Sequence, residues 1–171
     1  MRSRESWSWN RWETPLASVE DRLKDLGVSL PEVPPPVAAY VPAVVCGDLV
    51  FLSGQIARNS EGGLLSPGKL GDRVSLEEGY AAARQCALQA LAALRACIGD
   101  LDRVERVAKL TVFVAGAEGF DQQSVVANGA SELLEQVFGD RGRHARSAVG
   151  VAGLPLGASV EVELIARIRS E

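Results

Sequence analysis

The last quarter of the chain, residues 143–166, constrains the fold more than any other stretch. It holds two apolar runs, each typical of a β-strand, joined by the turn Leu154-Pro155-Leu156-Gly157. Proline fixes one backbone angle of such a turn, and glycine tolerates backbone conformations that other residues avoid. The sequence therefore predicts two strands that meet at this turn and pair with each other.

Three charged side chains interrupt these apolar strands. Arg146 begins the first strand, and Glu161 and Glu163 lie two residues apart on the second. Because side chains alternate across a strand, both carboxylates fall on one face, opposite the apolar residues between and beside them. An arginine and two acids on an otherwise apolar sheet are the best candidate for a functional site in this sequence.

The same stretch resembles the C-terminal signature of the RidA/YjgF family, also called the endoribonuclease L-PSP family. The signature consists of Ala145-Arg146-Ser147, residues 151–155 and Val160-Glu161-Val162-Glu163, in this order and at this spacing. Further agreement comes from Ser53-Gly54-Gln55 after an apolar run, from residues 109–114 and from Asn128, so the resemblance covers roughly residues 40–168. It implies an α+β, chorismate-mutase-like fold and a homotrimer with sites in the clefts between subunits. It implies no metal and no organic cofactor.

Composition limits the class of protein. With 171 residues, 47% of them hydrophobic, the chain can bury one sizeable core but is short for two domains. A formal net charge of −4 gives no general attraction to nucleic acid or to anionic membranes, and no apolar run is long enough to span a bilayer. Three cysteines do not make a disulfide framework, and one histidine with scattered cysteines does not make a metal site. We therefore expect a cytoplasmic protein that binds neither nucleic acid nor a membrane.

The chain divides into a leader and one domain. Residues 1–17, with three tryptophans among polar residues, are predicted to be an N-terminal tail. Residues 18–171 are predicted to form a single domain. Within it, residues 18–36 give a short helix that ends at Gly27 and a proline-rich connector, and residues 37–171 form the core.

Turn and capping residues set the order of elements in the core. Gly47-Asp48 predicts a hairpin, and Ser75 with Glu78 predicts a capping box at the start of a long helix that ends at Gly99. A strand over 106–115, a helix over 121–138 and the two final strands follow, so the predicted order is β-β-α-β-α-β-β. Two helices can cover only one face of the mixed β-sheet.

The other sheet face is predicted to carry Arg146 and the small residues Ala148, Gly150 and Ala152, with Phe113 and Ile165 nearby. This face is too apolar to be left in water, which indicates self-association. The residues alone predict a partner copy. The trimer is implied only by the resemblance.

The resemblance also assigns roles to single residues. It implies that Arg146 binds the carboxylate of an imino or enamino acid through two parallel hydrogen bonds and that Glu161 orients or deprotonates water. Tyr40, Ser53, Gly54, Asn128 and Ser147 would line the substrate cleft. The residues alone leave other interpretations open: Arg146 could form a salt bridge between subunits with one of the two acids, and the lining residues could be ordinary packing and turn residues. His144, the single histidine, stands among arginines that would keep it neutral, and it is more typical of a structural residue.

Two departures place the chain in a divergent branch of the family it resembles. Deaminating members usually have cysteine where this chain has Ala148, and Gly-Pro-Tyr where it has Ala39-Tyr40-Val41-Pro42. The predicted function is hydrolytic deamination of reactive 2-imino or enamino acids to 2-keto acids, which limits damage by these metabolites. The alternative is a non-catalytic, regulatory trimer that binds small carboxylic acids on the same fold. A ribonuclease is disfavoured because a single histidine leaves the usual acid–base pair incomplete.

Overall fold

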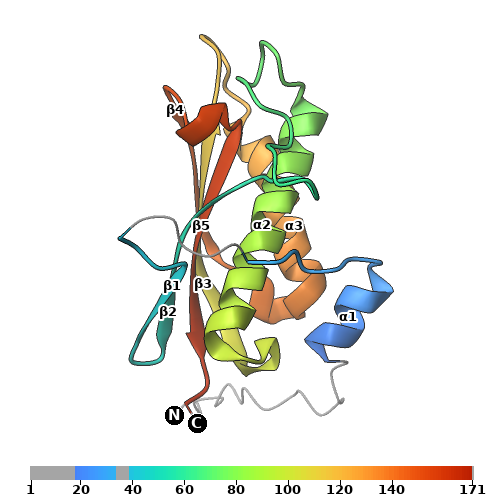
Figure 1. Cartoon of the computed structure of the whole chain (residues 1–171), viewed down its shortest axis with the longest axis vertical. Helices are drawn as coiled ribbons and strands as arrows, with labels where there is room; N and C mark the ends of the chain where they lie inside the picture. Colours follow the sequence, from blue (N-terminus) through green and yellow to red (C-terminus); the bar gives the residue numbers. More distant parts are fainter. Residues whose placement is uncertain (1–17, 34–38, 171) are drawn as a thin grey trace, which may run out of the picture.

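The computed structural model describes residues 18–33 and 39–170, and it has the predicted order of elements (Figure 1). The predicted tail and residues 34–38 of the connector lie outside the described residues. The helices are α1 (Val19–Asp25), α2 (Leu76–Ile98) and α3 (Gln123–Phe138). The strands are β1 (Ala43–Cys46), β2 (Leu49–Ile56), β3 (Val104–Ala115), β4 (Ala145–Val151) and β5 (Val160–Ile168).

The strands form one mixed sheet in the order β1-β2-β5-β3-β4. The prediction that β4 and β5 pair is wrong, because β3 lies between them, parallel to β4 and antiparallel to β5. The unit β3–α3–β4 is a crossover through a helix, which places β4 beside β3 in parallel. The Leu-Pro-Leu-Gly segment forms a short 3₁₀ turn inside a longer connection that carries the chain past the end of β3.

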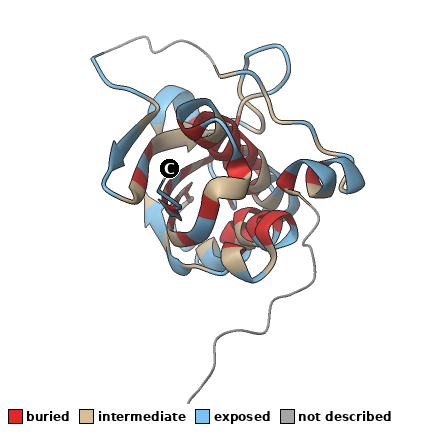
Figure 2. Ribbon diagram, turned by 90° about the horizontal axis from the view of Figure 1, so that it is seen from below, coloured by how far each residue is buried: buried red, intermediate tan, exposed pale blue. Residues whose placement is uncertain are grey.

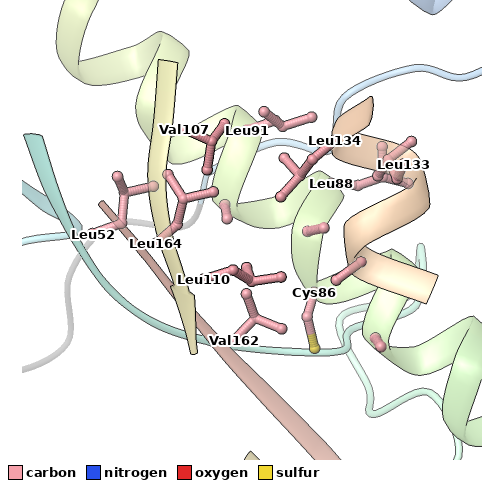
Figure 3. Close-up of a cluster of buried hydrophobic side chains, with 14 of the residues drawn as sticks. Leu52, Cys86, Leu88, Leu91, Val107, Leu110, Leu133, Leu134, Val162 and Leu164 are labelled. Atoms are coloured by element: carbon pink, nitrogen blue, oxygen red, sulfur yellow. The ribbon is translucent and has the colours of Figure 1, made fainter. Parts of the chain in front are cut away.

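Helices α2 and α3 pack side by side on one face of this sheet, as predicted, while the opposite face has no helix over it among the described elements (Figure 1). Figure 2 shows that burial is concentrated where these helices meet the sheet. Leucines and valines from both helices and from β2, β3 and β5 interlock there, and Cys86 is buried among them (Figure 3). The short helix α1 is attached beside α3, where the Arg22 side chain donates to the Val137 carbonyl at 3.3 Å.

The predicted ends of the long helix α2 are confirmed by its capping bonds. The Ser75 hydroxyl accepts from the Glu78 N–H at 3.2 Å, and the Glu78 carboxylate accepts from the Ser75 N–H at 2.8 Å. At the other end of α2, Gly99 adopts a positive φ of 82° and its N–H donates to the Arg95 carbonyl. These bonds satisfy backbone groups that a helix end leaves without partners.

The prediction that Arg146, Ala148 and Gly150 lie on the uncovered sheet face is wrong. In the parallel register with β3, Arg146 pairs with Leu110 and Ala148 with Val112, two residues buried beneath the helices. Alternation fixes which residues of β4 share a face, but only the register with β3 decides which face the helices cover. Ala152 lies beyond the end of the strand.

The uncovered face instead carries the residues of opposite alternation. On β4 and β3 these are Ser147, Val149, Thr111 and Phe113, and on β5 they are Glu161, Glu163 and Ile165, with Phe51 next to Ile165 on β2. Phe113 and Ile165 were correctly assigned to this face. A β-bulge in β3 breaks the simple alternation, so that Val107 and Leu110 both join the core although strict alternation would place them on opposite faces (Figure 3).

None of the described helices is both long and apolar enough to cross a membrane. All three cysteines are free thiols. Cys86 is buried and lies 3.5 Å from the Val160 carbonyl oxygen, while Cys46 and Cys97 are exposed.

Close packing of α2 against α3 requires a glycine at position 129. A Cβ added there would collide with the backbone carbonyl of Tyr80 on α2, which has no flexible end that could move away. In an ordinary helix interior, replacing glycine by alanine would stabilise the helix by about 1 kcal/mol. Here the helices would have to separate instead.

We therefore predict that Gly129→Ala destabilises the protein by roughly 1–3 kcal/mol, because overpacking outweighs the gain in helix propensity. Denaturant unfolding at a fixed protein concentration measures this change. Gly153→Ala is the matched control, since an added Cβ at that position has no atom within 4 Å, and we expect it to be neutral. A Gly129→Ala protein as stable as wild type would contradict the close-packing argument.

Candidate functional site

Arg146 lies at the start of the edge strand β4, and helix α3 holds its guanidinium in place. Its Nη1 donates to the Asn128 Oδ1 at 2.8 Å and to the Ser131 Oγ at 3.0 Å, and its Nη2 donates to the Ser124 carbonyl at 3.3 Å. Residues 124, 128 and 131 follow helical spacing, so all three face β4. The structure thus brings together Arg146 and Asn128, two residues that the resemblance assigns to the substrate cleft.

The partners of Arg146 are neutral oxygen atoms. Within residues 18–33 and 39–170 it has no ion pair. The alternative of a salt bridge between subunits with Glu161 or Glu163 stays a prediction. A guanidinium has five N–H donors, and three are used here. The remaining two donors, Nε–H and the second N–H of Nη2, are left for a ligand, and the side chain is exposed. This is the arrangement that a carboxylate needs for two charge-assisted hydrogen bonds.

A cavity of about 240 Å³ adjoins the guanidinium and is lined by Arg146, Ser131, His144 and the nearby residues Glu135, Gly142 and Arg143. The Arg143 side chain is bonded to Glu135 at 2.8 Å, which compensates its charge. His144 contacts Ser131 and the Gly142 carbonyl. Burial, more than any other factor, lowers the pKa of His144, so its predicted neutrality agrees with the structure although the neighbouring arginines are the lesser cause.

Glu161 lies on the other face of the sheet. Its half-buried side chain packs directly against Gly54 of β2, where an added Cβ would collide with the carboxylate. Burial and, to a lesser degree, the neighbouring Glu163 raise the pKa of Glu161, because both disfavour the ionised form. Glu161 therefore lies against Gly54, apart from Arg146, and its carboxyl is suited to proton transfer.

The remaining predicted residues belong to the region around Glu161 or to the uncovered face. Ser53 precedes Gly54 and donates from its hydroxyl to the Val41 carbonyl at 2.7 Å. Tyr40 is exposed in the segment that leads into β1. Ser147 lies on the uncovered face, where its hydroxyl accepts from the Lys109 Nζ at 2.7 Å.

The predicted site thus falls into two halves. Arg146 and Asn128 are on the helix-covered side at the sheet edge, whereas Glu161, Gly54 and Ser53 are on the uncovered side. The prediction that Arg146 and the two acids form one constellation within a chain is wrong, because it assumed that β4 and β5 are neighbours. Either half alone offers a carboxylate-binding group or a proton-transfer group, but not both.

Sequence analysis missed Ser131 and Ser124 as partners of Arg146. Ser131 follows Asn128 by three residues, so the two side chains share a helix face, whereas Ser124 contacts Arg146 through its backbone carbonyl. Their pairing with Arg146 could not be deduced, since it depends on the parallel register of β4. No group of three or more metal-binding side chains is found among the described residues.

Comparison with known proteins agrees with the geometry. The sequence model of a family described as "YjgF/chorismate_mutase-like, putative endoribonuclease" matches residues 20–168. Protein TCP17 of Trypanosoma cruzi is 48% identical over 153 residues, which cover 89% of this chain and 95% of that protein. A 2-iminobutanoate/2-iminopropanoate deaminase of the mite Dermatophagoides farinae is 30% identical over 139 residues, covering 81% of this chain and 92% of the mite protein.

Solved structures have the same fold. The protein Atu1372 of Agrobacterium tumefaciens, whose function is unknown, is 43% identical with a TM-score of 0.83, over 88% of this chain and 92% of its own. The YjgF gene product of E. coli is 27% identical with a TM-score of 0.57, over 81% of this chain and 94% of its own. Compared with the E. coli structure, the Agrobacterium structure therefore aligns with a larger part of this chain and has a more similar backbone geometry.

The raised pKa of Glu161 predicts a pH-dependent effect of Glu161→Gln on stability. A carboxyl whose pKa is raised by folding stabilises the native state at low pH, and this contribution is lost as the pH rises through the folded-state pKa. The amide removes the cost of the buried charge, so we expect Glu161→Gln to be more stable than wild type at neutral pH. Thermal unfolding from acid to neutral pH at a fixed protein concentration measures this.

The advantage of Glu161→Gln should shrink toward acid pH, where the wild-type carboxyl is protonated. Glu77→Gln, at an exposed position near the start of α2, is the control and should show no such gain in stability at neutral pH. A Glu161→Gln protein that is less stable than wild type at neutral pH would contradict this prediction, because it would show that the folded state favours the ionised form of Glu161.

Proposed function

The chain belongs to the RidA/YjgF family, and we propose that it hydrolyses reactive 2-imino and enamino acids to 2-keto acids. The observation that carries this proposal is the guanidinium of Arg146, which α3 holds with neutral oxygens while two of its donors and its charge remain available. A small ligand with a carboxylate matches this group. The printed name of the mite relative, a 2-iminobutanoate/2-iminopropanoate deaminase, supports this choice of substrate.

The reaction needs little activation. The imine carbon is already electrophilic, so water adds to it once the substrate is held in the right orientation, and collapse of the adduct expels ammonia and leaves the keto acid. Arg146 would bind the substrate carboxylate, and Glu161 would accept a proton from the attacking water and return it to the leaving nitrogen. A carboxyl with a raised pKa suits this exchange near neutral pH.

We further propose that each site is shared between two copies of the chain. In one chain the Arg146 half and the Glu161 half lie on opposite sides of the sheet, so a single chain does not present both to one substrate. A neighbouring copy that packs the β4 edge against an uncovered sheet face would complete the site. In this family the arrangement implied is a homotrimer with three equivalent clefts.

Subunit mixing tests the reaction and the shared site together. We expect Arg146→Ala and Glu161→Gln proteins each to lose most of the activity, measured as keto acid formed in an assay coupled to an imine-generating enzyme. When equal amounts are exchanged into mixed oligomers, about a quarter of the sites receive both native residues, so about a quarter of wild-type activity should return.

Two other outcomes have clear meanings. If mixing restores nothing although exchange is demonstrated, the two residues do not act in one shared site. If wild-type protein does not accelerate keto acid formation, the deaminase proposal is wrong. If 2-ketobutyrate nevertheless raises the thermal unfolding temperature of the wild-type protein, the alternative of a non-catalytic binder is favoured. The presence of Ala148, where deaminating members of the family usually have cysteine, is the specific observation behind this alternative.

The uncovered sheet face supports the proposed self-association. Val149 and Phe51 are each 42% exposed on it, and Val44 of β1 is 52% exposed. Together with Phe113 and Ile165 they make an apolar surface across five strands. A partner copy would remove this surface from water and so stabilise the assembly.

We predict that Val149→Asp dissociates the oligomer, because it would place an unpaired charge in an apolar interface. Light scattering measures the mass in solution. The control is Ala81→Asp, which adds the same charge at an exposed position near the start of α2 and should leave the mass unchanged. A wild-type protein that is monomeric, or a Val149→Asp protein with wild-type mass, would rule out assembly through this face.

A further inference from the structure

A row of hydrogen bonds extends from Arg146 through Ser131 and His144 to Gly142. The Arg146 Nη1 donates to the Ser131 Oγ at 3.0 Å, the Ser131 Oγ lies 3.1 Å from the His144 Nε2, and the His144 Nδ1 lies 2.6 Å from the Gly142 carbonyl oxygen. Three elements meet in this row: α3, β4 and the turn between them. The row also lines the 240 Å³ cavity beside the guanidinium.

When the His144 ring is neutral, only one arrangement of protons satisfies all three contacts. A carbonyl oxygen can only accept, so the His144 Nδ1 must carry a proton that it donates to Gly142. In the neutral ring, Nε2 is then an acceptor, and the Ser131 hydroxyl must donate to it. The hydroxyl oxygen is left to accept from Arg146, which can only donate. Every group in the row thus has one role, and the direction of the row is fixed by the Gly142 carbonyl.

From this geometry we infer that Ser131 and neutral His144 are positioning residues that hold the Arg146 guanidinium ready for a carboxylate, and that protonation of His144 releases it. This inference rests on the proposed role of Arg146, which it extends by a pH-dependent control. Neither residue would touch the substrate; both act through Arg146.

Protonation would reverse the contact at the middle of the row. An imidazolium carries hydrogens on both nitrogens, so Nε2 would donate to the Ser131 Oγ instead of accepting from it. A second positive charge would then stand beside the Arg146 guanidinium and repel it. The charged groups around His144 are Arg146 and Arg143 from the β4 side and Glu135 from α3. Arg146 opposes the new charge and Glu135 favours it, but Glu135 is already bonded to Arg143. Burial of the ring likewise favours the neutral form and lowers the pKa of His144.

The single histidine of the chain makes a direct test possible. Nitrogen-15 NMR of the imidazole in the whole protein should show the Nδ1–H tautomer at neutral pH and a pKa below the ordinary value for histidine. Arg146→Ala should raise that pKa, since it removes a repelling charge and opens the cavity. An Nε2–H tautomer, or a pKa that does not change in Arg146→Ala, would overturn the inference. This measurement needs no ligand and is independent of the proposed reaction.

Ligand affinity gives the second measurement, with 2-ketobutyrate as the probe and calorimetry as the method. For wild type we expect the dissociation constant to rise about tenfold between about pH 7.5 and about pH 5, a size typical of coupling between two sites. His144→Gln offers an amide oxygen to Ser131 and does not titrate, so its affinity should be nearly constant over this range. Ser131→Ala should bind weakly at both pH values, and Ser131→Thr should restore binding because it keeps the hydroxyl.

The variants distinguish the proposed role of His144 from an effect of Glu161 titration and from a failure of the carboxylate site itself. Titration of Glu161 affects wild type and His144→Gln alike, so only the difference between them reports on His144. Equal pH dependence in the two proteins, or wild-type affinity in Ser131→Ala, would overturn the positioning role. If wild type does not bind 2-ketobutyrate at neutral pH, the proposed carboxylate site fails, and the NMR measurement still decides whether the row is coupled to Arg146.

Discussion

The close contact between α2 and α3 at Gly129 determines where the candidate site can form. Without a Cβ at this position, α3 lies directly against the Tyr80 backbone and buries Val126, Ala130 and Leu133 in the core. The adjacent face of the same helix then points toward the sheet edge, and Asn128 on that face reaches Arg146. One helix thus uses two neighbouring residues for two tasks, glycine for packing and asparagine for holding the arginine.

Local features of the fold could be predicted from the sequence because their causes are local. The capping box at Ser75, the glycine at the end of α2 and the two-residue turn of the first hairpin depend on residues a few positions apart. The pairing of strands could not be predicted in the same way. β4 and β5 are neighbours in the sequence, yet β3 separates them, because the α3 crossover delivers β4 parallel to β3. Because of this one error, Arg146 was predicted to lie on the wrong face of the sheet, and two half-sites that lie apart in a single chain were predicted to form one site.

The site residues likewise divide into those that sequence motifs identify and those that depend on contacts between distant parts of the chain. Arg146, Asn128, Glu161 and Gly54 could be selected from sequence motifs, and the structure gives each a specific neighbour. Ser131 and His144 could not be assigned, since their roles depend on contacts between α3 and the start of β4. The three arginines of residues 141–146 are alike in sequence but not in environment. Arg141 donates to the Val104 carbonyl and lies near Asp102, and Arg143 is paired with Glu135. Arg146 alone of the three has no acid among its partners in the described part of the chain, so the neutral oxygens that hold its guanidinium do not neutralise its charge.

The edge position of β4 connects the chemistry to assembly. A strand at the sheet edge has one side free of sheet neighbours, and here that strand carries Arg146 on its covered face and Val149 on its uncovered face. Unpaired strand edges and exposed apolar faces are both features that folded proteins normally cover. A second copy placed at this edge would cover them and, in the same step, bring a Glu161 from its own uncovered face toward the arginine. The separation of the two half-sites within one chain is then a consequence of how the sheet is built, and the proposed assembly would bring together two groups that a single sheet holds on opposite faces.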